Sequence, residues 1–466
     1  MTEKELIKKL MERLWGKYDY ASILKASSVG KNYSVSAGGI TISQNDLWSQ
    51  DGYVIKVVDK GVVCEYSFNV LSEDELSEIE KAVGELLECR RNLSETFGVN
   101  NYEAPDEEVV KSFTENEVTD SPIECPDDEI IDRLKDLREY AMSLDERLLD
   151  CKTVVQYQEY EKYFLSPKKE LSQKVLWTCS FFMLFAKKGD VVRNVYKAFS
   201  NRDGMKVLDK MKEKIAPAVK DVIDLLDAES ITPGEYECVC TPEVTGMIVH
   251  EAFGHGVEMD MFVKNRALAK EYIGKQVASP LVTMHDGAAA AVEVATYDFD
   301  DEGTPATDTV VIDKGILVSG ICDNLSAQAL GVKPTGNGRR ESFERKAYTR
   351  MTNTFFEGGT DTVEDMIKSI KHGYLLADPT CGMEDPKNWG IQCMVNSARE
   401  IVDGKLTGKI YSPIILSGYV PDLLKSISMM SSNVELCGSG ACGKGYKEFV
   451  KVSDGGPYIK AKVKIG

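Results

Sequence analysis

Two of the four histidines in the chain flank a glutamate within six residues, in the segment His250-Glu-Ala-Phe-Gly-His255. Imidazole nitrogen is a preferred zinc ligand, and catalytic zinc sites combine three protein ligands with one open position. Glu251, adjacent to His250, can reach the attacking water, accept its proton and pass it to the leaving amine. The segment therefore indicates zinc-dependent peptide hydrolysis, with His250 and His255 as ligands and Glu251 as general base.

A helix is expected to carry this segment. Thr241 is a suitable N-cap, Pro242 is a suitable first helical residue, and residues 244–255 would form the helix. The two histidines are five residues apart, which places them about 140° apart on an ideal helix. An undistorted helix would not direct both rings at one ion, so Gly254 predicts that the helix kinks, widens or ends there. On this spacing alone, two satisfied histidines in a core helix remain an alternative.

The wider pattern predicts an α+β protein of two domains, because 466 residues exceed one ordinary core. Residues 1–232 are expected to form an α+β domain with an antiparallel sheet, and 100–128 an exposed acidic connection within it. After Pro233, residues 233–466 are expected to form a β-rich catalytic domain that contains the metal-site helix. Periodicity predicts helices at 3–16, 72–93, 127–149 and 206–226, and strands within 33–37, 52–66 and 153–200.

Composition excludes several functional classes. The net charge is −19 (56 basic and 75 acidic residues), which disfavours binding to nucleic-acid phosphates. No apolar run approaches the roughly 20 residues that a membrane span needs; the longest, Val175–Ala186, fits a buried strand. The first residues lack the apolar centre of a signal peptide, so we expect a cytoplasmic protein without a membrane or nucleic-acid partner.

Five segments, in this order, resemble the TldD/PmbA family and its TldD branch. The similarity covers the chain from about Glu235 to the C-terminus and, more weakly, the N-terminal domain. The segments are His250-Glu-Ala-Phe-Gly-His-Gly-Val-Glu258, Asp301-Glu-Gly-Thr-Pro305, Pro334-Thr-Gly-Asn-Gly-Arg-Arg-Glu-Ser342, Arg350-Met-Thr-Asn-Thr354 and Cys442-Gly-Lys-Gly445. The resemblance implies a metallopeptidase that cleaves small or unfolded polypeptides. It also implies a homodimer or a heterodimer with a related subunit that lacks the His-Glu-His motif.

The resemblance implies a third zinc ligand, which falls on Cys442. Its glycine-rich surroundings let the backbone approach closely, and Lys444 would favour the thiolate. Two imidazoles and a thiolate suit one zinc ion per chain. Cys437 lies in a similar glycine setting and His285 is a fallback ligand, so the roles of both stay open.

Substrate contacts are harder to assign from the sequence. Asn337, Arg339 and Arg340 lie in a glycine turn and could bind a substrate carbonyl or a developing oxyanion. The alternative is a loop held by an arginine ion pair.

Two other functions remain as alternatives to a zinc peptidase. One is a non-catalytic regulatory or interaction subunit of the same family. The other is a zinc deaminase, but its downstream Pro-Cys-x-x-Cys segment is missing from the sequence. Metal content separates the first alternative from the peptidase, and a substrate screen separates the second.

Overall fold

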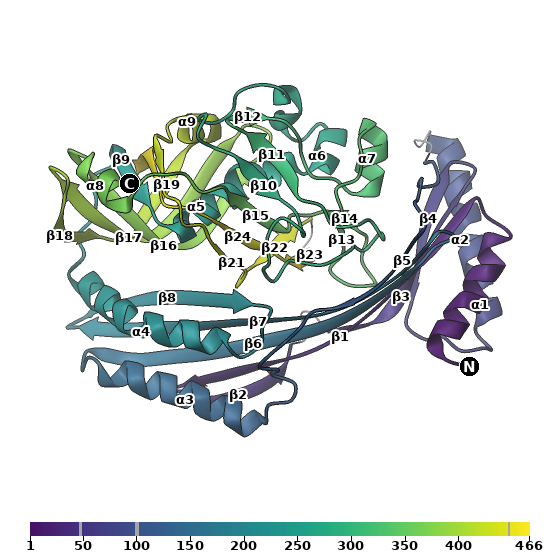
Figure 1. The fold of residues 1–466 in the computed structure, drawn as a ribbon, viewed down its shortest axis with the longest axis horizontal. Helices are drawn as coiled ribbons and strands as arrows, with labels where there is room; N and C mark the ends of the chain where they lie inside the picture. Colours follow the sequence, from purple (N-terminus) through teal and green to yellow (C-terminus); the bar gives the residue numbers. More distant parts are fainter. Residues whose placement is uncertain (46–48, 98–101, 446–447) are drawn as a thin grey trace.

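An eight-stranded sheet occupies the N-terminal half of the computed structural model (Figure 1). The residues that the structure describes are 1–45, 49–97, 102–445 and 448–466. Strand order is β4-β3-β1-β6-β7-β5, with β2 paired to β1 and β8 paired to β7. All neighbours are antiparallel except β5 and β7. The bounds are β1 (Tyr20–Ser36), β2 (Gly39–Gln44), β3 (Gln50–Asp59), β4 (Val62–Phe68), β5 (Val110–Glu115), β6 (Leu148–Leu165), β7 (Lys169–Lys188) and β8 (Val191–Asn201).

Four helices cover one face of this sheet, and the C-terminal half of the chain covers the other (Figure 1). The helices are α1 (Glu3–Trp15), α2 (Leu76–Phe97), α3 (Asp127–Ser143) and α4 (Val207–Asp224). The side chains of strand β6 show which face of the sheet each part of the chain covers. Tyr157 and Tyr163 pack with the helices, whereas Phe164 contacts Phe299, and Lys162 pairs with Asp301 of the C-terminal half. Side chains alternate between the faces of a strand, so burial on both faces explains the apolar run that became β7.

The C-terminal half contains two larger sheets and two hairpins. A seven-stranded sheet has the order β16-β9-β25-β19-β17-β18 with β20 on β25, and a six-stranded sheet has the order β12-β11-β10-β15-β24-β21. The hairpins are β13-β14 and β22-β23. The strands are β9 (Gly234–Cys240), β10 (Met284–Asp286), β11 (Thr309–Asp313), β12 (Ile316–Leu317), β13 (Gly338–Arg339), β14 (Tyr348–Thr349), β15 (Asn353–Phe356), β16 (His372–Asp385), β17 (Gly390–Val402), β18 (Lys405–Tyr411), β19 (Ile414–Tyr419), β20 (Met429–Met430), β21 (Glu435–Cys437), β22 (Ala441–Lys444), β23 (Glu448–Lys451), β24 (Ser453–Gly456) and β25 (Ile459–Ile465).

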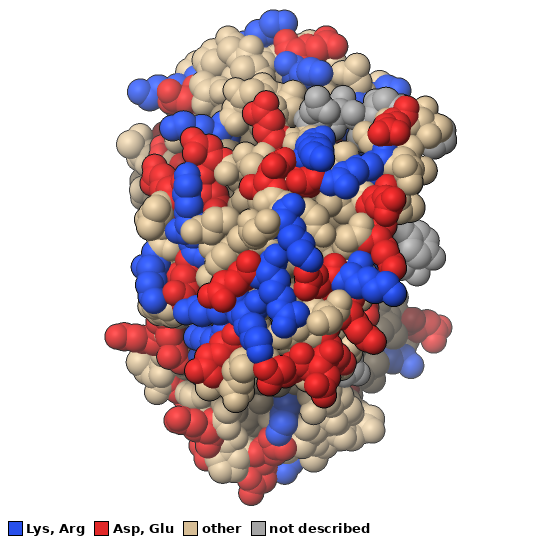
Figure 2. All heavy atoms as spheres, turned by 90° about the vertical axis from the view of Figure 1, so that its right-hand side faces the viewer, with Lys and Arg blue, Asp and Glu red and all other residues tan. Residues whose placement is uncertain are grey.

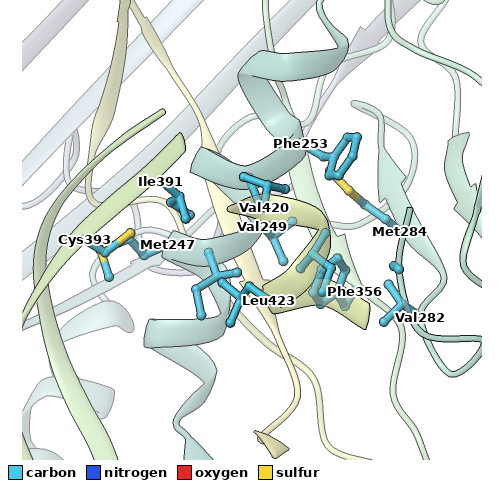
Figure 3. Packing of buried hydrophobic residues seen from close by; sticks show 14 of the residues in the cluster. Met247, Val249, Phe253, Val282, Met284, Phe356, Ile391, Cys393, Val420 and Leu423 are labelled. Carbon is cyan, nitrogen blue, oxygen red and sulfur yellow. The ribbon is translucent and has the colours of Figure 1, made fainter. Parts of the chain in front are cut away.

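Helix α5 (Pro242–Val249) is packed between the two larger sheets of this half. It contacts β15, β21 and β24 of one sheet and β16 and β17 of the other. Figure 3 shows Met247 and Val249 of this helix within the buried cluster, among side chains such as Phe356 from β15 and Ile391 from β17. Every residue of α5 except Glu243 is buried, so the residues that follow the helix are held in place by the core. The other helices here are α6 (Met259–Val263), α7 (Asn324–Leu330), α8 (Val363–Lys368) and α9 (Val420–Lys425).

The predicted fold class is confirmed: an N-terminal antiparallel sheet with helices precedes a β-rich region that contains the helix before the His-Glu-His segment. Two local expectations differ from the structure. Within 100–128, expected to be an exposed connection, β5 pairs with the edge of the sheet through its backbone, although Phe113 on it is 52% exposed. Helix α3 ends at Ser143 rather than at residue 149, because β6 begins at Leu148. The division at residues 232 and 233 stays a prediction.

The surface agrees with the composition. Figure 2 shows basic and acidic side chains interspersed over one face, including a basic group near its middle that acidic side chains border. Among the described residues, no helix combines the length and the apolar character that crossing a membrane requires.

Candidate metal centre

The His-Glu-His segment lies where the α5 helix widens. Thr241 stands at the N-cap without a side-chain capping bond, Pro242 opens the helix, and α5 ends at Val249. The next five residues, His250–Gly254, form a π-helix, and the backbone N–H of His255 donates to the carbonyl oxygen of His250. A π turn closes over five residues instead of four, so side chains five apart return to the same side.

This widening brings the two imidazoles together. The ring centroids of His250 and His255 are 5.1 Å apart, and the rings are nearly perpendicular at 86°. Gly254 leaves no room for a side chain, because a Cβ there would lie 2.2 Å from Sδ of Met351. The sequence prediction that the helix departs from ideal geometry at Gly254 is confirmed, in the form of a widened turn.

Cys442 reaches the same place from the β22-β23 hairpin. Its Sγ lies 3.5 Å from Nε2 of His255, and the donor atoms of Cys442, His250 and His255 all lie within 4.8 Å of one another. Arg350, only 1% exposed, holds the hairpin by donating to the carbonyl oxygens of Cys442 (2.5 Å) and Glu448 (3.1 Å). A buried arginine therefore connects segments that are 92 to 98 residues apart in the chain.

The donor set fits zinc. Burial by itself would raise the pKa of the Cys442 thiol, but the imidazoles of His255 and His250 outweigh it and hold that pKa well below its usual range. Burial opposes protonation of His255, yet the Cys442 thiolate and Glu258 raise its pKa well above the usual value. These opposite pKa shifts favour a thiolate beside two imidazoles, and these are the nitrogen and sulfur donors that zinc prefers.

Two carboxylates lie behind the imidazoles. Glu258, 2% exposed, places Oε2 at 3.4 Å from Nδ1 of His255, which directs Nε2 toward Cys442. Asp454 Oδ2 lies 3.5 Å from Nδ1 of His250, a buried atom without a hydrogen-bond partner among the described residues. Carboxylates in this position fix the orientation and tautomer of metal-binding histidines.

Lys444 has a different role from the one expected. Its Nζ lies 3.0 Å from Glu258 Oε2 and donates to Asp260 (2.6 Å) and to the carbonyl oxygen of Thr349 (2.9 Å). Burial would raise the pKa of Glu258, but Lys444 and then His255 lower it to about 2. The lysine therefore keeps Glu258 ionised, and the imidazoles stabilise the thiolate.

Glu251 lines the same cavity as the donor group without belonging to it. The cavity has a volume of about 690 Å³, and His250, Glu251, His255 and Cys442 contribute to its wall. The Glu251 side chain lies against Gly382 of β16, where a Cβ would be 2.5 Å from Glu251 Cγ. A carboxylate beside the donor group and open to the cavity can contact a water or a substrate.

Comparison with known proteins identifies the family. The model of the PmbA/TldA metallopeptidase C-terminal domain matches residues 233–466. The chain belongs to the PmbA/TldD metallopeptidase family. The family predicted from the five sequence segments is thereby confirmed, and the assignment to the TldD branch stays a prediction.

Several relatives of this PmbA/TldD chain are named as metalloproteases. The Metalloprotease TldD homolog of Buchnera aphidicola is 30% identical over 275 residues, which are 59% of this chain and 56% of that protein. A metalloprotease of Methanocaldococcus jannaschii is 26% identical over 99% of both chains. The Zinc metalloprotease TldD homolog of Saccharolobus solfataricus is 28% identical over 66% of this chain and 69% of its own length. The crystal structure of TldE from Thermococcus kodakarensis shares the fold, with a TM-score of 0.73 and 18% identity over 98% of this chain and 100% of that one.

The residues expected to contact substrate in this family member lie elsewhere. Asn337 is fully buried and donates to Asp286 and to a backbone carbonyl, and Arg339 donates to the carbonyl oxygen of Met351. Arg340 pairs with Glu65 of the N-terminal sheet. None of the three lines the cavity beside the donor group. These contacts match the alternative interpretation, a loop held by an arginine ion pair.

The two fallback ligands are also separate from the donor group. His285 lies on β10 with Nδ1 2.6 Å from Asp308 and Nε2 2.9 Å from Glu357, so both ring nitrogens are engaged. Cys437 ends β21 and lies near Ser200 and the carbonyl oxygen of Ala198.

Sequence reasoning missed the supporting carboxylates. Glu258 could have been recognised, because it lies three residues after His255 in the segment His250–Glu258 that resembles the family. Asp454 and Glu384, which also face this centre, have no local pattern that marks them.

Proposed function

We propose that this chain is a zinc-dependent peptidase of the TldD branch, with one zinc ion per chain held by His250, His255 and Cys442. The observation that carries the proposal is the convergence of these three donors within 4.8 Å, beside Glu251 and in one cavity. A purely structural role for the segment would not require a widened helix turn, a cysteine whose pKa two imidazoles hold low and an adjacent carboxylate in the cavity wall together.

The chain's own residues account for the proton transfers of peptide hydrolysis. Zinc, when bound, supplies Lewis-acid chemistry that lowers the pKa of a water molecule and polarises a carbonyl group. Glu251 accepts the proton of the attacking water and delivers it to the leaving amine. Glu258 orients the imidazole of His255, and Asp454 places a carboxylate 3.5 Å from Nδ1 of His250.

We propose small or unfolded polypeptides as the substrates. The cavity beside the donor group is about 690 Å³, a volume that accommodates several residues of an extended chain. Efficient cleavage of a stable, folded protein at internal sites would contradict this substrate class.

We also propose assembly as a homodimer or as a heterodimer with a related subunit that lacks the His-Glu-His motif. Met394 on β17 and Ile415 on β19 lie opposite each other, and each is 39% exposed. Neighbouring exposed apolar side chains on a sheet face are suited to a protein interface. Light scattering of the purified chain, alone and with the related subunit, tests this assembly.

The experiment that tests the function is the substitution Glu251→Gln. The amide is nearly isosteric and no donor is lost, so zinc content and melting temperature should stay unchanged. Peptide cleavage should fall by roughly two to four orders of magnitude, the usual contribution of a positioned acid–base group. Glu364→Gln on α8, an exposed glutamate, is the matched control and should retain full activity.

The alternative function, a non-catalytic regulatory subunit, predicts a different outcome. In that case neither the unsubstituted chain nor Glu251→Gln would cleave any peptide, whatever its zinc content. Retained cleavage in zinc-loaded Glu251→Gln would instead refute the general-base assignment.

A further inference from the structure

Glu384 lines the cavity of the candidate metal centre, although it is outside the donor group. It lies near the end of β16, and its carboxylate approaches the residue next to His255, because a Cβ on Gly256 would lie 2.8 Å from Glu384 Oε1. Both carboxylate oxygens are buried, and neither has a hydrogen-bond partner in the described part of the chain. A buried carboxylate without partners destabilises a protein unless a ligand completes its hydrogen bonds.

The charges around Glu384 leave room for a cation. Glu251 and Glu258 are further acidic side chains of the same cavity. Lys264, Arg266 and Lys444 are basic side chains of this wall. Lys264 is paired with Asp260, and Lys444 is paired with Glu258 and Asp260. No ion pair of the described residues includes Glu384, so none of these basic side chains is paired with its carboxylate.

We propose that Glu384 binds a cationic group of the substrate, either the free α-ammonium group of a peptide or the charged side chain of lysine or arginine. This inference rests on the proposed peptidase function and adds a substrate class to it. Because Glu384 approaches the residue beside His255, the cation lies close to the bond that is cut. A charged hydrogen bond to a buried carboxylate is among the stronger polar contacts in a binding site.

The test uses four hexapeptides on one alanine backbone: free N-terminus, acetylated N-terminus, acetylated with a central lysine and acetylated with a central glutamine. Calorimetry measures their affinity for zinc-loaded Glu251→Gln protein, with and without Glu384→Gln. Cleavage of the same peptides is measured in the chain with Glu251 intact. One pair compares the free with the acetylated N-terminus, and the other compares the central lysine with the central glutamine. We expect the cationic peptide of at least one pair to bind at least about tenfold more tightly than its neutral counterpart, and Glu384→Gln to abolish the difference.

Glu364→Gln is the matched control and should keep the discrimination. Glu384→Met is a second variant that removes the charge without leaving a buried polar group, so the test does not depend on one substitution. A preference for the free N-terminus assigns the α-ammonium group, and a preference for lysine over glutamine assigns the side chain.

Equal affinity within both pairs, no binding of any peptide, or discrimination that survives Glu384→Gln would overturn the proposal. Charge-dependent binding without any cleavage by the intact chain would support the recognition role and refute the peptidase function. The two proposals can therefore fail separately.

Discussion

Replacing Glu258 by glutamine tests how the protein orients His255. The carboxylate accepts from Nδ1 of His255 at 3.4 Å, and its charge is balanced by Lys444 at 3.0 Å and by Arg350 at 3.9 Å. Glutamine keeps the size of the side chain and one carbonyl acceptor, but it removes the negative charge. The substitution therefore changes the electrostatic support of the histidine with little change in packing.

The other contacts of Lys444 and Arg350 confine the effect of this substitution to the metal centre. Lys444 keeps Asp260 and the carbonyl oxygen of Thr349, and Arg350 keeps its two backbone carbonyl acceptors. The main loss is the ionised acceptor that makes the imidazole a better donor to zinc. Loss of such a supporting carboxylate lowers metal affinity about 10- to 100-fold, or about 1.4 to 2.7 kcal/mol.

Competition with a chromophoric chelator measures the zinc affinity of the Glu258→Gln protein. The matched control is Glu357→Gln, which alters a second His–Glu pair, with His285, outside the donor group. The control should bind zinc as tightly as the unsubstituted chain. An unchanged zinc Kd in Glu258→Gln, with the fold intact, would refute the orienting role.

Three further predictions concern the same centre. Cys442→Ala should lose most of the zinc, because one of three donors is removed, and elemental analysis of the purified protein measures it. Zinc affinity should rise as the pH rises through the raised pKa values of His250 and His255, because both imidazoles must lose a proton before they bind zinc. Calorimetry in buffers of different ionisation enthalpy should show that zinc binding releases more protons at lower pH. Gly254→Ala should lower stability by about 1 to 3 kcal/mol in thermal or chemical unfolding, because its Cβ would overlap Met351 Sδ.

Each of these predictions has a control or an outcome that contradicts it. Full zinc content in Cys442→Ala would move the third ligand elsewhere, and Cys437 and His285 would be substituted next. Zinc binding that is independent of pH would contradict the imidazolium–thiolate pair. Gly418→Ala on β19 is the control for Gly254→Ala, because a Cβ there meets no atom within 4 Å, and it should leave stability nearly unchanged.

The fold class followed from patterns that are local in the sequence. The β-branched and aromatic residues over 153–200 predicted the long strands β6 to β8, and helical periodicity over 206–226 predicted α4 nearly to its ends. Strand β5 was missed because an edge strand held by backbone hydrogen bonds needs no apolar pattern. The helix at 127–149 was predicted too long, because the competing strand pairing that begins at Leu148 involves residues far away in the sequence.

The sequence by itself determined the chemistry that the chain offers: two histidines around a glutamate, and a glycine-rich segment with a cysteine. Only the tertiary structure decided how these groups meet. The spacing of the histidines left open whether the helix kinks, widens or ends at Gly254. The structure shows a widened turn, with Gly254 close to Met351. The β22-β23 hairpin, anchored by Arg350, brings Cys442 to the imidazoles. The pairing of Lys444, like the burial of Glu384 without a partner among the described residues, depends on contacts between segments distant in the chain, which no local pattern encodes.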